Sequence, residues 1–144
     1  MKTRFRFENL IVWQHARRLN QHIYRATRAF PGHELFGMTS QIRRASVSIS
    51  SNIAEGSGRN SDKDFAHFLE QAYGSTMEVA SLLYLALDET YVSEHDSNSV
   101  FEEIETLAKG IVALNRSLKV EGSKTPFTRK PCSQTLDPRP SALD

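Results

Sequence analysis

The chain has 144 residues, of which 39% are hydrophobic and 24% charged, the composition of one soluble globular domain. No apolar run approaches the roughly 18 residues of a membrane span, so we expect no membrane-spanning helix. The N-terminal MKTRFRFENL lacks the apolar segment of a signal peptide, so we expect a cytoplasmic protein. The single cysteine, Cys132, excludes an internal disulfide and is expected to be a free, reduced thiol.

The net charge of +1 conceals opposite charges in the two halves of the chain. Residues 1–60 contain ten Lys or Arg and three Asp or Glu, whereas residues 61–120 contain four and eleven. A surface for nucleic acid or for another acidic partner would produce this asymmetry. Two helix pairs that neutralise each other, within or between subunits, would produce it equally, and both interpretations stay open.

The first predicted helix runs from Asn9, a plausible N-cap, to Ala29, because Phe30-Pro31-Gly32 is a stop signal. Its apolar residues recur every three or four positions and form the seam Val12, Ala16, Leu19, Ile23 and Ala26. A basic stripe without an acid repeats on an adjoining face: His15, Arg18, His22, Arg25 and Arg28. Trp13 is most simply an anchor between helices, and the alternative is a ligand-stacking residue.

The second predicted helix follows the turn from Pro31 to Gly37, with Thr39 as a possible cap, and carries two stripes. One is a core-facing seam: Met38, Ile42, Ala45, Ile49, Ile53 and Gly56. The other, which we call the polar seam, is Gln41, Arg44, Ser48, Asn52, Glu55 and Arg59. The helix is expected to end at the Gly56-Ser57-Gly58 break, with glycine in a left-handed cap.

Small residues between the two stripes would let other helices approach from several sides. We therefore expect the polar seam to be buried and mutually paired, inside the bundle or at a subunit boundary. A solvated face is the alternative. Glu78, on the next helix, is a candidate partner for Arg44 or Arg59 and is counted with the polar seam.

Ser61 and Asp64 have the spacing of a capping box and open a third predicted helix. Its seam is Phe65, Phe68, Leu69, Ala72, Thr76, Val79, Leu83 and Leu87. After a polar turn, Ser99 and Glu102 repeat this spacing and precede the fourth seam: Ile104, Leu107, Ala108, Ile111, Leu114 and Leu118. Four such helices with short connections predict an all-α, antiparallel up-down-up-down four-helix bundle over residues 1–119.

The helical pattern stops at Val120, and four of the five prolines follow: Pro126, Pro131, Pro138 and Pro140. We expect residues 120–144 to be a disordered tail. Phe127 and Leu136 leave a short binding motif within it as the alternative.

The search for catalytic chemistry finds only weak signals. A di-iron bundle needs Glu-x-x-His on two helices, and the nearest match is a single Asp64-x-x-His67. A phosphate loop needs Lys-Ser/Thr after its glycines, which Gly56-Ser57-Gly58 lacks. We therefore predict a protein that is not an enzyme, with no catalytic residues, no metal and no cofactor.

Several motifs carry a resemblance to a known family: Phe7-Glu8-Asn9-Leu10, Val12-Trp13-Gln14, Gly74-Ser75, and Gln-Ile-Arg-Arg-Ala through Asn-Ile-Ala-Glu-Gly within residues 41–56. With them the chain resembles, over roughly residues 5–119, the "four helix bundle protein" family, known as open reading frames inside 23S rRNA intervening sequences. Many relatives have proline where this chain has Ser50. The resemblance implies an antiparallel bundle, a ring of five subunits and no established activity. The accessory proteins of diversity-generating retroelements, which associate with nucleic acid, are distantly similar.

The leading functional hypothesis is a non-enzymatic homo-oligomer that binds the phosphate backbone of RNA or DNA non-specifically. Its partners would be further copies of itself, a pentamer by resemblance, and nucleic acid, but no membrane. The predicted lack of an exposed aromatic platform argues against sequence-specific recognition. The alternative is a structural or protein-interaction scaffold without a nucleic-acid role. The candidate nucleic-acid-binding residues are Arg18, Arg25, Arg28 and Arg43.

Overall fold

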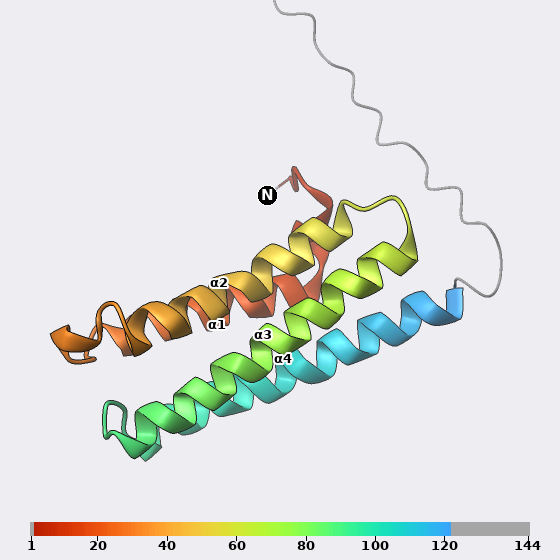
Figure 1. Cartoon of the computed structure of the whole chain (residues 1–144). Helices are drawn as coiled ribbons and strands as arrows, with labels where there is room; N and C mark the ends of the chain where they lie inside the picture. The colour runs from red at the N-terminus through yellow and green to blue at the C-terminus, as the bar shows by residue number, and fades with distance from the viewer. Residues whose placement is uncertain (1, 122–144) are drawn as a thin grey trace, which may run out of the picture.

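The structure is a computed structural model that describes residues 2–121. The helix expected to stop before Val120 runs on to Glu121, and the rest of the predicted tail, Cys132 included, lies outside the described residues. Four α-helices and two short 3-10 helices follow one another: η1 Arg6–Asn9, α1 Ile11–Thr27, η2 Gly32–Glu34, α2 Met38–Ser57, α3 Asp62–Asp88 and α4 Glu94–Glu121. The α-helices lie side by side with their directions alternating (Figure 1). The predicted all-α four-helix bundle is confirmed. None of the described helices combines the length and the apolar character needed to cross a membrane.

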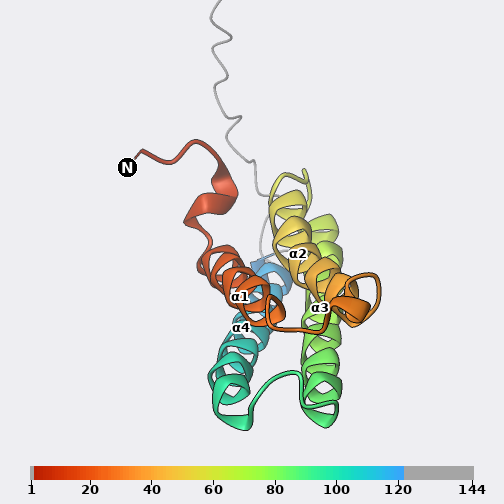
Figure 2. The same cartoon turned by 90° about the vertical axis from the view of Figure 1, so that its left-hand side faces the viewer.

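The helices contact one another in cyclic order around the bundle. α1 packs on α2, α2 on α3, α3 on α4, and α4 returns to α1 (Figure 2). Within the described residues, no Cα atoms of the diagonal pairs α1/α3 and α2/α4 come within 8 Å. The edge between α1 and α2 is therefore opposite the edge between α3 and α4, which places the basic and acidic helix pairs on opposite sides.

The predicted seams form the core of the bundle. Leu19, Ile49, Leu69 and Leu107, one from each helix, are fully buried in a single hydrophobic cluster. Some seam residues are only half-buried: Ala26, Met38, Phe68, Leu87, Ala108 and Leu114. The simple periodicity missed other buried positions: Thr27, Thr39, Ser46, Ser57, Ala66, Leu82, Ala86, Ser97 and Val100. Packing from two neighbouring helices makes the buried stripe wider than one seam.

Gly56 allows α2 and α3 to approach each other closely. A Cβ atom at this position would lie 2.7 Å from Cβ of Phe68 and 2.8 Å from Cδ2 of Phe65. The glycine is thus required by the packing of α3. The predicted left-handed glycine cap is wrong, because Gly58, the C-cap of α2, has φ −84° and stays right-handed.

Side chains from preceding residues start three of the helices. Ser61 Oγ accepts a hydrogen bond from the Asp64 backbone N at 3.1 Å, so the predicted cap of α3 is confirmed. α4 begins at Glu94, five residues before the predicted Ser99, because Ser93 Oγ accepts a hydrogen bond from a first-turn backbone N. α2 begins at Met38, whose backbone N donates to Glu34 Oε2 at 2.8 Å.

Two predicted N-caps are wrong for local reasons. Asn9 belongs to η1, and α1 begins only after Leu10, which has an extended backbone. Thr39 is buried inside the first turn of α2 and does not precede it. In both places a short 3-10 segment shifts the helix start, and hydrophobic periodicity does not detect such segments.

Candidate functional site

The first two α-helices carry a concentration of positive charge. Between residues 9 and 54 the chain has one acid, Glu34, and six arginines: Arg17, Arg18, Arg25, Arg28, Arg43 and Arg44. Among the described residues, no carboxylate forms an ion pair with any of the six. Glu34 is itself engaged as the cap of α2. The charge of these six arginines is therefore not neutralised by a direct ion pair among the described residues.

The predicted basic stripe of α1 divides into two sides in the folded protein. On one side, His22 Nδ1 lies 2.7 Å from Glu103 Oε1 of α4. Arg18 and His15 line a groove of about 320 Å³ with Glu102 and Glu103. The stripe has no acid along its own helix, but α4 supplies carboxylates beside this part of it. The α4 side of the stripe is therefore partly balanced by carboxylates of another helix.

The other side of α1 faces α2, and Arg43 extends from α2 toward it. The Arg43 side chain is half-buried between the two helices, where Nε donates a hydrogen bond to Thr27 Oγ1 at 2.8 Å. Its Cζ atom lies 4.8 Å from the ring centroid of Tyr24. Arg25 and Arg28, next to and one turn after Tyr24, are exposed. The structure thus brings Arg43 to the Tyr24 and Arg28 side of α1, whereas Arg25, seven residues after Arg18, lies on the Arg18 side of the helix.

Two residues on this edge were not among the predicted site residues. Tyr24 is 39% exposed, so one aromatic ring reaches this surface, with the Arg43 guanidinium against it. Arg17 is exposed, and its Cζ atom lies 5.7 Å from the ring of Trp13. The spacing of Trp13 and Tyr24, eleven positions apart, already indicates a common helix face at about 100° per residue.

Most of the polar seam lies on the surface of the single bundle. Ser48 and Asn52 are half-buried, but five members are exposed: Gln41, Arg44, Glu55, Arg59 and Glu78. Burial inside the bundle is therefore wrong for these five side chains. Burial at a subunit boundary stays a prediction.

The described side-chain contacts of the polar seam lie within residues 41–59 or join these residues to α3. Ser48 Oγ and Ser75 Oγ, 3.0 Å apart, join α2 to α3, and Asn52 Nδ2 donates to the Ser48 carbonyl oxygen at 2.9 Å. Arg59 pairs with Glu55 at 3.0 Å on the exposed surface, a contact that contributes about 0–1 kcal/mol. Glu78 forms an ion pair with neither Arg44 nor Arg59 within the described chain. Arg44 and Glu78 line a groove of about 500 Å³ with Phe36.

An apolar groove of about 630 Å³ runs along the opposite edge, between α3 and α4. Tyr84 is 60% exposed there, with its ring centroid 4.5 Å from that of Phe101. Tyr73 and Met77 extend the exposed apolar surface along α3. Exposed apolar surface of this kind, rimmed by charged residues, is typical of protein interfaces.

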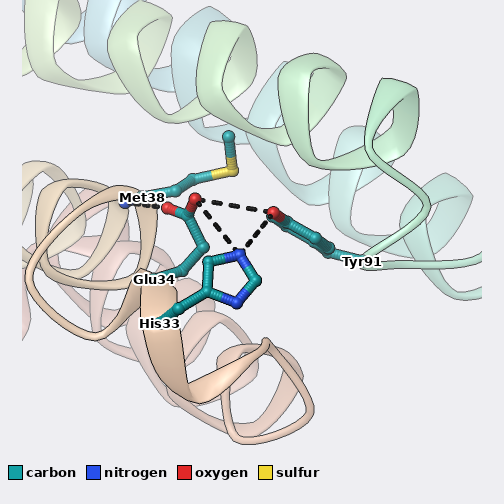
Figure 3. A network of polar contacts seen from close by, with 4 residues as sticks. All are labelled: His33, Glu34, Met38 and Tyr91. Atoms are coloured by element: carbon teal, nitrogen blue, oxygen red, sulfur yellow. Dashed lines mark hydrogen bonds and ion pairs between the residues drawn. The ribbon is translucent and has the colours of Figure 1, made fainter.

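A polar network closes one end of the bundle (Figure 3). The Tyr91 hydroxyl lies 3.5 Å from both Glu34 Oε1 and His33 Nε2, so it joins the chain after α3 to η2. Partial burial, and then the carboxylates of Glu34 and Glu89, raise the pKa of Tyr91 above its ordinary value. These contacts link the turn between α3 and α4 to η2, so we assign the network a structural role. Within residues 2–121, no group of three or more His, Cys, Asp or Glu side chains is placed to hold a metal ion.

Comparisons with known proteins are consistent with this architecture. Residues 8–113 match the family described as 23S rRNA-intervening sequence protein. A crystal structure of a protein with unknown function from the S23 ribosomal protein family of Bacteroides thetaiotaomicron VPI-5482 superposes with a TM-score of 0.54. The two sequences are 23% identical, and the match covers 80% of this chain and 100% of that chain. At 23% identity, this structural similarity shows a shared fold and nothing more. No curated protein matches the chain.

Proposed function

The chain belongs to the 23S rRNA-intervening sequence protein family, and on that premise we propose a non-enzymatic helical-bundle protein that self-assembles and binds the backbone of RNA or DNA. The proposed binding surface is the exposed basic part of α1 and α2. Its candidate residues are Arg18, Arg25, Arg28 and Arg43, to which the structure adds Arg17.

One observation supports the proposal above all: six arginines on two adjacent helices have no carboxylate partner in the described chain. Contacts to phosphate need only positive charge at suitable spacing, and they carry no sequence information. Arg25 and Arg28 are exposed and meet these requirements without any change of fold. The binding should accordingly be weakly selective for sequence and strongly dependent on salt.

The scaffold alternative draws support from the α4 side of α1. The contact between His22 and Glu103, and the position of Arg18 beside Glu102, indicate that part of the basic charge is balanced within the subunit. If the remaining arginines met acidic side chains of neighbouring copies, the protein would be a structural or protein-interaction scaffold. The binding experiment below separates the two functions.

We further propose that the protein forms a closed homo-oligomer, with five subunits as the family resemblance implies. The apolar groove between α3 and α4 would receive the α2 surface of a second copy, where Phe36 is 93% exposed beside Arg44 and Glu78. These two surfaces lie on adjacent faces of the bundle that share α3. A contact between different, adjacent faces turns the chain at every step and closes a ring when the rotation divides a full turn, whereas a contact between opposite faces extends a filament. The polar seam would then lie at the boundary.

Titration of the assembled protein with a labelled RNA hairpin and a DNA duplex tests the nucleic-acid function. Replacing Arg18, Arg25 and Arg28 by Gln should weaken binding to both, while the fold is kept, because these side chains are exposed and make no described contact that holds the bundle together. The matched control replaces three exposed lysines of the opposite helix pair, Lys63, Lys109 and Lys119, by Gln. Equal losses in the two triple variants would indicate a bulk-charge effect and contradict a defined surface on α1.

A further inference from the structure

Two aromatic rings lie on one face of α1, each with an arginine beside it. Trp13 and Tyr24 are eleven residues apart, close to three helical turns, which places them on the same face about 16 Å apart along the axis. Arg17 and Arg28 follow the rings by one turn each. Arg43 of α2 completes a set that we call the aromatic–arginine face: Trp13, Arg17, Tyr24, Arg28 and Arg43.

The aromatic–arginine face points toward the α2 edge and away from the acidic helices. Asn20, on the same side of α1, accepts a hydrogen bond from Ser46 Oγ of α2 at 3.0 Å, whereas His22 and Arg18 turn toward Glu103. The two acids nearest to this face in the sequence, Glu8 and Glu34, make hydrogen bonds elsewhere. Glu8 accepts hydrogen bonds from two backbone N atoms, and Glu34 caps α2 and contacts Tyr91.

Arg43 is held in place before any ligand binds. Its Nε atom donates to Thr27 Oγ1, and the Thr27 hydroxyl in turn donates to the Ile23 carbonyl oxygen at 2.8 Å. The guanidinium is thereby fixed over the Tyr24 ring. A ring and a positive charge are presented together with little conformational freedom left to lose on binding.

We propose that the aromatic–arginine face binds single-stranded nucleic acid, with the exposed ring of Tyr24 stacking against an unpaired base and the arginines contacting the flanking phosphates. Trp13 is half-buried against Phe7 and the core, so it reports on binding from the same face and is not itself assigned a base. This inference rests on the proposed nucleic-acid function and specifies its ligand. The reason is steric. A duplex covers its base faces by stacking, so the Tyr24 ring on a convex helix surface reaches only the bases of a single strand. Base stacking on aromatic side chains tolerates any sequence, because every base has a π-face.

Two exposed tyrosines elsewhere on the bundle lack this combination. Tyr73 and Tyr84 belong to the acidic helix pair, where the surrounding carboxylates would repel phosphate. Tyr84 is more exposed than Tyr24, at 60% against 39%. It therefore provides a matched control for the effect of removing a surface tyrosine.

Trp13 gives a direct signal, because it is the only tryptophan of the chain. The full-length protein is titrated with oligouridylate and oligothymidylate of about 15 nucleotides, within the usual range of single-strand sites, and with a blunt duplex of the same length. We expect saturable quenching of the Trp13 fluorescence by the single strands and little by the duplex. The two single strands show whether RNA and DNA are both accepted.

Variants at Tyr24 test the stacking ring. Tyr24→Ala should weaken single-strand binding about 5- to 100-fold, the usual range for loss of one stacking ring, and Tyr24→Phe should restore it. The salt dependence should stay unchanged in both, because no phosphate contact is removed. Tyr84→Ala should bind like the wild type. Tyr24→Phe also keeps the ring under Arg43, so it separates a binding defect from a packing defect.

The outcomes distinguish this inference from the function on which it rests. Equal affinity for single strand and duplex, with Tyr24→Ala binding like the wild type, would overturn the stacking site but leave backbone binding intact. No binding to any of the three probes at low salt would overturn both. A Tyr24→Phe variant as weak as Tyr24→Ala would also contradict stacking, because the ring would be present without effect.

Discussion

Arg43 and Tyr24 form a stacked pair across the edge between α1 and α2. The Arg43 Cζ atom lies 4.8 Å from the Tyr24 ring centroid, and Nε of the same side chain donates to Thr27 Oγ1 at 2.8 Å. One arginine therefore joins the two basic helices and presents positive charge at their surface. The energetic and the functional consequences of this arrangement can be tested separately.

Arg43→Ala should destabilise the bundle by about 1–2 kcal/mol, because it removes a partly buried hydrogen bond and a cation–π contact. Arg44→Ala is the matched control. Arg44 is exposed and has no ion-pair partner among the described residues, so its loss should change the free energy of unfolding by about 0.5 kcal/mol or less. Urea unfolding of both variants measures the difference. Equal values would show that the contacts of Arg43 contribute nothing to stability.

Gly56→Ala should destabilise the protein by about 1–3 kcal/mol, because the new Cβ would overlap the Cβ of Phe68, an atom that moves only with the backbone of α3. Gly74→Ala is the counterpart, since nothing lies within 4 Å of a Cβ at that position. There the better helix propensity of alanine should stabilise the bundle by about 0.5–1 kcal/mol. Thermal unfolding compares the two, and a stabilising effect of Gly56→Ala would contradict the close approach of α2 and α3.

Tyr91 should make stability dependent on pH in the alkaline range. Its pKa is raised in the folded protein above the ordinary 10.0, so the neutral phenol is favoured by folding. This contribution is fully present below pH 10.0 and is lost as the pH rises through the raised pKa, because the unfolded chain ionises first. Urea unfolding from about pH 8 to about pH 11 should show a smaller loss for Tyr91→Phe than for the wild type. Parallel losses would contradict the raised pKa.

Tyr84→Ser should reduce the mass of the assembled protein, because it places a polar side chain in the apolar groove that we assign to the next copy. Phe36→Ser should have the same effect through the other surface of the same contact. Gln21→Ser, at an exposed position of α1, should leave the mass unchanged. Light scattering at micromolar concentration measures all three. A monomeric wild type would contradict assembly, and normal mass in both groove variants would contradict this interface.

The fold was predictable because the apolar periodicity is strong in every helix. In each helix, apolar residues recur every three or four positions and so share one face. The structure buries the central residue of each such face: Leu19, Ile49, Leu69 and Leu107. The helix starts were less predictable. Glu34 caps α2 from a position four residues before Met38, outside the usual capping pattern. A single sequence also contains no signal that Gly56 faces Phe68 of another helix.

The candidate site was predictable in composition but less so in arrangement. The sequence shows that α1 has no acid, but the approach of Glu103 to His22 depends on how α4 packs against α1. Likewise, Arg43 reaches Tyr24 only because α2 lies beside α1 in the bundle. Contacts within a helix follow from spacing, whereas contacts between helices require the packing geometry. The contact between Tyr24 of α1 and Arg43 of α2 is a contact between helices, so the sequence alone did not predict it.

The salt dependence of nucleic-acid binding tests the central claim most directly. The affinity of the wild-type protein for RNA and DNA is measured from about 50 mM to about 200 mM salt, where each neutralised phosphate of a duplex adds about −0.9 to the slope of log K against log salt. We predict measurable binding at the low end and a steep negative slope, which flattens when Arg18, Arg25 and Arg28 are replaced together by Gln. No binding of wild-type protein to either nucleic acid near 50 mM salt would contradict the proposed function and favour the scaffold.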